Sequence, residues 1–254
     1  MDKYKKLGFS LILPAIILFI WFYSTTYKGV PDAILPTIQS VGKAFKTTIT
    51  SGQLQEDLQV SFIRVIKGYL CAVLLGIIAG VLTGMNEYIK VFLNLTLTTI
   101  RQIPMVAWVP LIILWFGIDD MSKIVTIVLA AFFPVMINVS NGIATTPKAY
   151  LELARIYKMS PWKTFIRVYL PNALPSVFVG LRLALGSSWM AVVAAEILGA
   201  TSGMGYRLSF SRTLMQPDIM FTCMIVIGIV GIIMDKLLLY LFQILTPWSD
   251  EKKG

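Results

Sequence analysis

The 254-residue sequence contains no histidine and only two cysteines. A chain without histidine lacks the side chain that most often serves as a general acid or base near neutral pH and as a nitrogen ligand of metals. Cys71 and Cys223 lie in apolar runs, which is typical of buried thiols rather than of a disulfide or a metal site. Since paired carboxylates and nucleophile–base arrangements are also missing, we predict no catalytic residues and no metal site.

Charge is scarce as well. Only 14% of the residues are charged, whereas 57% are hydrophobic. This leaves too little polar surface for a water-soluble globule, so we predict an integral membrane protein in contact with lipid, formed by a single domain over residues 1–254. The net charge of +9 then reflects the side of the bilayer on which basic residues lie, and no nucleic-acid partner is expected.

Six apolar segments are long enough to cross a bilayer as helices. The predicted fold class is therefore all-α with six transmembrane helices. No small-x-small cleavage pattern follows the first segment, so we expect a retained helix rather than a signal peptide. The predicted spans are residues 9–26, 62–85, 88–116, 124–144, 174–198 and 219–245.

The polar interval 28–59 contains Ile38, Val41, Phe45 and Ile49 at helical spacing. This pattern predicts an amphipathic helix resting on the outer membrane surface.

The second span carries a stripe of small residues at four-residue spacing, since Gly68, Ala72, Gly76, Gly80 and Gly84 follow one another along it. Small residues let two helices approach closely in lipid. The stripe therefore predicts a helix–helix contact, and packing within the subunit is favoured over a homodimer interface.

The third span is interrupted by Arg101, Gln102, Pro104 and Pro110. A charge at the bilayer centre costs about 2.5–3.5 kcal/mol on insertion scales, and broken helices persist in membranes where they line a cavity or are buried in protein. We therefore favour a role in a solute pathway over simple kinked packing.

Other polar residues lie at membrane depth. Asn138 and Asn141 share a face of the fourth span, where they could bind another helix or contact a solute. Arg182 and Glu196 lack a partner in their own helix, so a functional role and an interhelical ion pair are equally favoured. The pathway candidates are Arg101, Pro104, Asn138, Asn141, Arg182, Ser187, Ser188 and Glu196.

The interval between the fourth and fifth spans is basic and polar. Tyr150–Tyr157 is rich in helix formers, and Ser160 followed by proline is typical of the start of a second helix, Pro161–Val168, with a corner at Lys158. Pro171 is expected to end that helix or to reset it into the fifth span. Basic residues are denser here and at both termini than in the alternate loops, which predicts that all three lie in the cytoplasm.

This interval resembles a known motif. Its residues Glu152, Ala154, Ser160, Phe165, Val168, Leu170 and Pro171 resemble the EAA loop in permease subunits of bacterial ATP-binding-cassette (ABC) importers. Leu35–Phe45, Ile103–Ile118 and Gly180–Ala200 are similar to the branch that serves sulfonate, taurine, nitrate and related anions. The likeness runs from residue 31 to about residue 206, with Leu153 and Lys158 in place of the usual alanine and glycine.

The resemblance implies the type I importer permease fold, in which residues 148–171 form a coupling loop that docks on an ATPase. The implied coupling residues are Glu152, Ala154, Arg155, Lys158, Ser160, Pro161, Trp162 and Phe165. It further implies a location in the bacterial inner membrane, two ATPase subunits, a second permease copy and an external solute-binding protein.

The chain has no G-x-x-x-x-G-K-[ST] phosphate-binding loop, so we expect it to bind no cofactor and the partner ATPase to carry ATP and Mg²⁺. The expected solute is a small anion such as a sulfonate, taurine, nitrate or bicarbonate. One alternative is another small organic solute, such as a pyrimidine vitamin precursor. An ion-coupled secondary transporter remains a rival class, and a membrane-embedded enzyme is the weakest option.

Overall fold

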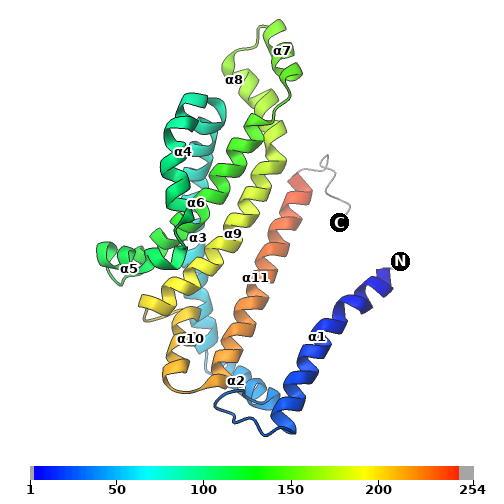
Figure 1. Ribbon diagram of the computed structural model, residues 1–254, viewed down its shortest axis with the longest axis vertical. Coiled ribbons are helices and arrows are strands. Elements are labelled where there is room, and N and C mark those ends of the chain that lie inside the picture. Colours follow the sequence, from blue (N-terminus) through cyan, green and yellow to red (C-terminus); the bar gives the residue numbers. More distant parts are fainter. Residues whose placement is uncertain (1–2, 246–254) are drawn as a thin grey trace.

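The computed structural model describes residues 3–245, with side chains at position 9 and over 11–244, and this part of the chain is built from helices without strands (Figure 1). The helices are α1 (Lys3–Thr26), α2 (Ile38–Thr50), α3 (Gln53–Met85), α4 (Glu87–Gln102), α5 (Met105–Phe116), α6 (Asp120–Ala144), α7 (Lys148–Ile156), α8 (Pro161–Thr164), the π-helix η1 (Phe165–Tyr169), α9 (Leu170–Gly199), α10 (Met204–Thr213) and α11 (Pro217–Leu245).

The core is a layer of three long helices in which α6 lies between α3 and α9. The small-residue stripe of α3 faces α6. The predicted packing of this stripe within the subunit is therefore confirmed. A Cβ atom added at Gly68, Gly76 or Gly80 would lie 2.6–2.7 Å from a side-chain carbon of Ile127, Val135 or Val139, respectively. The two backbones are therefore close enough that only glycine fits at these positions.

Within the described residues, four helical stretches are long and apolar enough to cross a membrane: α3, α6, residues 161–199 and α11. The broken third span is confirmed, because α4 and α5 meet at an angle of 96° and form a fifth crossing if the pair counts as one. The apolar part of α1, Leu11–Thr26, is shorter. The count of six spans remains a prediction, and the predicted cytoplasmic residues 252 and 253 lie outside the described residues.

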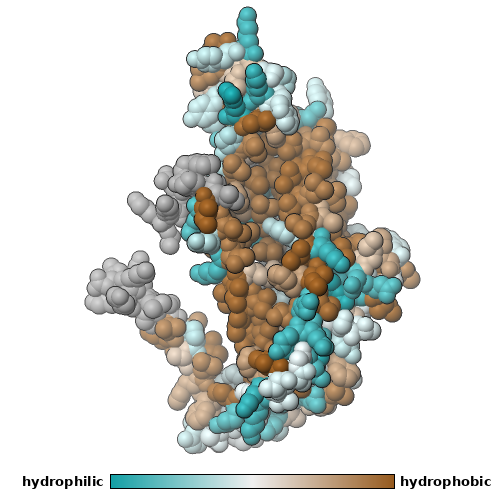
Figure 2. All heavy atoms as spheres, turned by 180° about the vertical axis from the view of Figure 1, so that it is seen from behind, coloured by the Kyte–Doolittle hydropathy of each residue, from teal (hydrophilic) through white to brown (hydrophobic). Residues whose placement is uncertain are grey.

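The arrangement separates two ends of the molecule. Helices α7 and α8 lie at one end, α2 and α10 lie at the other, and α1 stands apart from the bundle (Figure 1). A hydrogen bond of 2.8 Å from Trp21 Nε1 to the Pro36 carbonyl joins α1 to the segment that precedes α2. Apolar side chains cover most of the long body in Figure 2, as expected of a protein in a bilayer, while polar side chains gather at the top and in a band that runs from mid-height on the right to the lower end.

The predicted amphipathic helix forms as α2. Val41, Ala44 and Thr48 are buried, and Thr222 of α11 donates a hydrogen bond to the Val41 carbonyl. Ile38, Phe45 and Ile49 are exposed, as apolar side chains that rest on a membrane surface would be, and that membrane contact stays a prediction.

At Pro171 the sequence predicted either the end of a short helix or its reset into the fifth span, and the structure has the second. Pro171 lies in the first turn of α9, and the chain stays helical from α8 through η1 into α9. Proline lacks the N–H that an α-helix requires, and a wider turn just upstream accommodates it: the Leu170 N–H bonds to the Phe165 carbonyl, five residues back. The predicted short helix Pro161–Val168 is thus the first part of the fifth span.

The contact between α3 and α6 gives a stability prediction. In the G80A variant the new Cβ would lie 2.6 Å from Val139 Cβ and 2.8 Å from the Met136 carbonyl oxygen. We expect this overpacking to lower the free energy of unfolding by about 1–3 kcal/mol. The matched control is G228A on α11, where nothing lies within 4 Å and higher helix propensity should stabilise by up to about 1 kcal/mol. Thermal unfolding in detergent measures both, and equal stability of G80A and the wild type would contradict the close contact.

Candidate functional site

The corner of the coupling loop is a helix C-cap. Tyr157 is the C-cap of α7, Lys158 has a φ of 48°, and the Met159 N–H donates to the Ala154 carbonyl at 2.9 Å. This six-to-one hydrogen bond with a left-handed residue defines the Schellman motif, which glycine usually occupies. The predicted corner at Lys158 is confirmed, and lysine holds it at a conformational cost of about 1–2 kcal/mol.

The second helix of the coupling loop begins as predicted. Ser160 precedes α8, and its Oγ accepts a hydrogen bond from the Lys163 N–H at 3.4 Å, while Pro161 occupies the first turn. On the other side, α7 follows α6 after a three-residue link, residues 145–147. Both sides of the coupling loop are therefore attached to long core helices.

The coupling loop exposes large aromatic side chains at the end of the molecule opposite α2 and α10. Tyr157 is 77% exposed and Trp162 is 69% exposed, and the Trp162 ring stacks on Phe165 with centroids 6.1 Å apart. Among the predicted coupling residues, Ala154 is buried and Phe165 is half-buried, so these two support the loop from within. The exposed ones are Glu152, Arg155, Lys158, Ser160, Pro161 and Trp162. An apolar patch bordered by charges is typical of a protein interaction surface.

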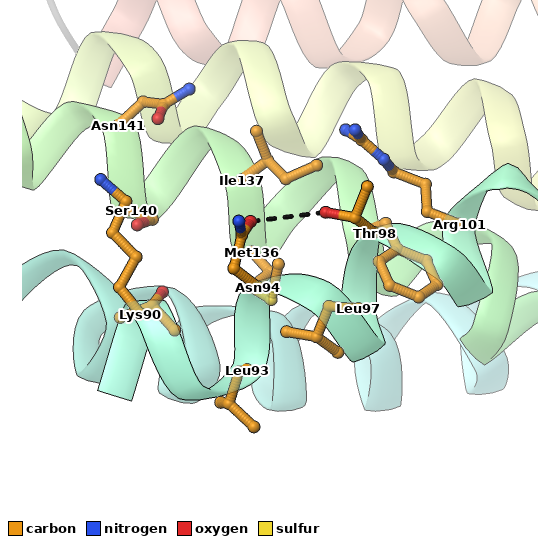
Figure 3. Close-up of a pocket in the computed structure, with 12 residues that line it drawn as sticks. Lys90, Leu93, Asn94, Leu97, Thr98, Arg101, Met136, Ile137, Ser140 and Asn141 are labelled. Atoms are coloured by element: carbon orange, nitrogen blue, oxygen red, sulfur yellow. Dashed lines mark hydrogen bonds between the residues drawn. The ribbon is translucent and has the colours of Figure 1, made fainter. Parts of the chain in front are cut away.

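Half of the pathway candidates line one pocket. Arg101, Pro104, Asn138 and Ser187 meet on a pocket of about 610 Å³ between α4, α5, α6 and α9, whose walls are otherwise mainly apolar. The polar groups on its wall bond to their own helices: Asn138 Nδ2 donates to the Pro134 carbonyl and Ser187 Oγ to the Leu183 carbonyl. Asn141 and Arg101 line a second pocket of about 210 Å³ between α4 and α6 (Figure 3).

Three pathway candidates lie elsewhere. Arg182 makes hydrogen bonds of 2.6 and 2.8 Å to both carboxylate oxygens of Asp235 on α11. Ser188 is buried and donates to the Ala184 carbonyl of its own helix. Glu196 is 1% exposed and bonded to Arg64, so the interhelical ion pairs weighed from the sequence are present for both charges of the fifth span.

Glu196 belongs to a buried polar network that joins α3, α6, α9 and α10. Arg64 donates to Glu196 at 2.8 Å, to Asp120 at 2.6 and 2.8 Å, and to the Ser202 carbonyl at 2.8 Å. Ser61 Oγ lies 2.9 Å from both carboxylate oxygens of Glu196, and the Gly205 N–H donates to one of them at 3.0 Å. The Glu196 carboxylate and the Arg64 guanidinium thus each have several partners, as burial of charge requires, whereas the Asp120 side chain is 60% exposed.

Glycine is needed where α10 begins. Gly203 has a φ of 111°, and a Cβ at this position would collide with the Glu196 carboxylate. Its N–H donates to Asp57 Oδ1 at 2.8 Å, and the other Asp57 oxygen accepts from Arg207. The α9–α10 link is therefore held against the first turns of α3.

Sequence reasoning missed this network, because its partners on different helices are far apart along the chain. One signal was available: Asp57, Ser61 and Arg64 follow one another at helical spacing and continue, on the same face of α3, into the small-residue stripe. A polar stripe in line with a close-packed stripe indicates that both face protein rather than lipid.

The sequence matches one protein family over most of its length. The model for the binding-protein-dependent transport system inner membrane component matches residues 72–250. The chain belongs to this family. It is an ABC importer permease, located in the inner membrane, and it moves solute rather than catalysing a reaction. The resemblance in the sequence is confirmed, and a secondary carrier is not favoured.

Individual relatives agree with this membership. The permease is 37% identical to the aliphatic sulfonates transport permease protein SsuC of Bacillus subtilis (strain 168), over 98% of this chain and 91% of that protein. It is 30% identical to the taurine transport system permease protein TauC of Escherichia coli (strain K12), over 97% and 92%.

A solved structure shares the fold. An inward-facing structure of the MetNI methionine ABC transporter matches with a TM-score of 0.63 and 16% identity, covering 76% of the permease and 94% of that chain. The predicted type I importer permease fold is confirmed.

The polar network gives a second stability prediction. The R64L variant leaves the buried Glu196 carboxylate without its cation, so we expect the free energy of unfolding of the permease to fall by about 3–5 kcal/mol. R155L, at an exposed position on α7, is the control and should change it by less than about 0.5 kcal/mol. Adding E196M to R64L should recover part of the loss, as measured by denaturant unfolding in detergent. An R64L variant as stable as R155L would show that the network does not hold the helices together.

Proposed function

We propose that the permease carries small sulfonates across the inner membrane, powered by a separate ABC ATPase that docks on the coupling loop. The observation that carries the solute class is the agreement between two relatives: both SsuC and TauC are named for organic sulfonates. Arg101 on the wall of the larger pocket suits this class, since it adds a cation to a surface that is otherwise mainly apolar. An alkanesulfonate has a matching apolar part and a single anionic group.

The proposed assembly contains two copies of the permease, two ATPase subunits that hold ATP and Mg²⁺, and an external solute-binding protein. Both termini and the coupling loop face the cytoplasm in this arrangement. The direction of the helices supports it, because α1 runs away from the end that carries α7 and α11 runs back toward it (Figure 1).

The proposed mechanism uses the continuity of the fifth span. Because α8, η1 and α9 form one uninterrupted helical stretch, residues 161–199, a displacement of α8 by the ATPase would move α9 as well. Helix α9 packs on α6 and lines the larger pocket through Leu183, Ser187 and Met190. ATP-driven movement of the coupling loop would therefore change the width of this pocket and switch its access between the two sides of the membrane.

Docking predicts that Trp162 contributes strongly to the affinity for the ATPase. Exposed aromatic side chains at the centre of an interface often contribute 2 kcal/mol or more, so W162A should weaken ATPase binding at least about tenfold. Co-purification and ATP-dependent uptake in proteoliposomes measure the effect. Y27A is the matched control, because Tyr27 is 70% exposed and directly follows α1, which runs away from the end of the molecule that carries α7 and α8 (Figure 1). Unchanged ATPase binding by W162A would argue against docking at this surface.

Solute transport predicts that uptake of an alkanesulfonate needs ATP, the ATPase and the binding protein together. In such proteoliposomes the R101Q variant should lower the uptake rate about tenfold or more, because it removes the cation of the larger pocket. K28Q, at an exposed loop position, is the charge-matched control. Uptake driven by an ion gradient without the ATPase would refute the proposal, and normal uptake by R101Q would remove Arg101 from the pathway.

A further inference from the structure

Helix α4 has its polar and apolar sides arranged for a water-filled groove. Lys90, Asn94, Thr98 and Arg101 follow one another at spacings of four, four and three residues, so they share one side of the helix, which Figure 3 shows directed toward α6. The residues of the outer side are large, apolar and 67–88% exposed: Tyr88, Val91, Phe92 and Leu95.

The two sides of α4 suit different surroundings, one lipid and the other water. In a bilayer the outer side of α4 is suited to contact with hydrocarbon, whereas a stripe with two cations is not. The stripe lines the pocket of about 210 Å³ between α4 and α6, into which Ser140 and Asn141 also project (Figure 3). The pocket is therefore a groove with seven polar and five apolar lining residues, next to the larger and mainly apolar pocket.

The chemistry of the groove is one-sided. Two cations, two amides and three hydroxyls line it, and no carboxylate does. In the described part of the chain neither Lys90 nor Arg101 takes part in an ion pair. The one polar contact within the groove, from Thr98 Oγ1 to Asn94 Oδ1 at 3.4 Å, engages the amide oxygen and leaves the amide N–H groups of Asn94 to donate. Such a set of donors without an opposing acid binds anions.

The groove continues from the larger pocket, because Arg101, Phe133 and Ile137 line both. Lys90 lies eleven residues before Arg101, about 16 Å along the helix axis, so the two cations mark the two ends of the groove. An anion that leaves the larger pocket at Arg101 would meet Lys90 next. Two separate cations hold an anion more weakly than a single clustered site, which allows it to leave again.

We propose that the groove between α4 and α6, from Arg101 to Lys90, is a second site for the oxyanion group of the solute, on the cytoplasmic side of the larger pocket. The position of this site in transport rests on the proposed function, whereas its preference for anions follows from the groove alone. Lys90, Asn94 and Asn141 are the residues that bind the sulfonate oxygens after Arg101.

Thiol modification tests the charge preference directly. An N94C variant is prepared with C71A, which removes the exposed native cysteine, and is assembled with its ATPase and binding protein in nanodiscs. The probes are an anionic reagent, sulfonatoethyl methanethiosulfonate, and a cationic one, trimethylammonioethyl methanethiosulfonate. Relative to a free thiol, we expect the anionic-to-cationic rate ratio at position 94 to be about tenfold higher.

The controls separate charge from access. Adding K90Q and R101Q to N94C should return the ratio to that of a free thiol, because the field of the two cations is gone. L95C, one residue along and on the outer side, should react with neither reagent, since lipid excludes both. Size-exclusion chromatography confirms that each variant is folded. A ratio at N94C that equals the free-thiol value, or one that K90Q with R101Q leaves unchanged, would overturn the proposal.

Protection experiments identify the source of the anion. Ethanesulfonate should slow modification of N94C, which assigns the site to the transported solute. Slowing by inorganic phosphate alone would assign the groove to a cytoplasmic anion and overturn its place in transport. The test of the groove is independent of the test of the solute. A raised anionic-to-cationic rate ratio at position 94 would support the groove even if sulfonate uptake failed. Sulfonate uptake together with a free-thiol ratio at position 94 would refute the groove and leave the proposed function standing.

Discussion

Helices α3 and α6 can approach each other closely because Gly68, Gly76 and Gly80 have no side chain, and much of the structure depends on this contact. Apolar side chains give little net drive for association in lipid, so close backbone approach and the dispersion contacts it allows must hold the two helices together. Helix α6 then packs another side on α9 and faces α4 across the smaller pocket. The coupling loop connects α6 to α9, and residues of α6 line both pockets.

The same face of α3 serves two purposes along its length. Its first turns hold the charged residues Asp57 and Arg64, and the following turns hold the glycines. The charged part lies at the end of the molecule where α10 returns toward α3, so ion pairs there fix the link between α9 and α10. Polar bonds at one end and close packing over the rest thus hold α3, α6 and α9 together as one unit.

The pockets differ in chemistry because α4 and α5 are separate helices. The break at Ile103 and Pro104 turns α5 by 96° away from α4, which opens the larger, mainly apolar pocket at the junction. Helix α4 then runs beside α6 with its polar stripe inward. A single straight span could not offer an apolar pocket and a cationic groove in succession, and Arg101 sits where the two meet.

Local signals in the sequence determined much of this protein. Composition predicted a helical membrane protein, glycine spacing predicted the α3–α6 contact, and the EAA-like residues predicted the coupling loop with its corner at Lys158. Each of these depends on neighbours within a few turns of one helix. Only the tertiary structure decided the partners of charged residues: Arg64 with Glu196, and Arg182 with Asp235, are pairs between different helices. It also decided which polar residues share a pocket, and it showed that a wide turn carries the chain past Pro171 without a break. Sequence spacing specifies which side chains share a helix face, but the rotation and crossing of helices decide what that face meets.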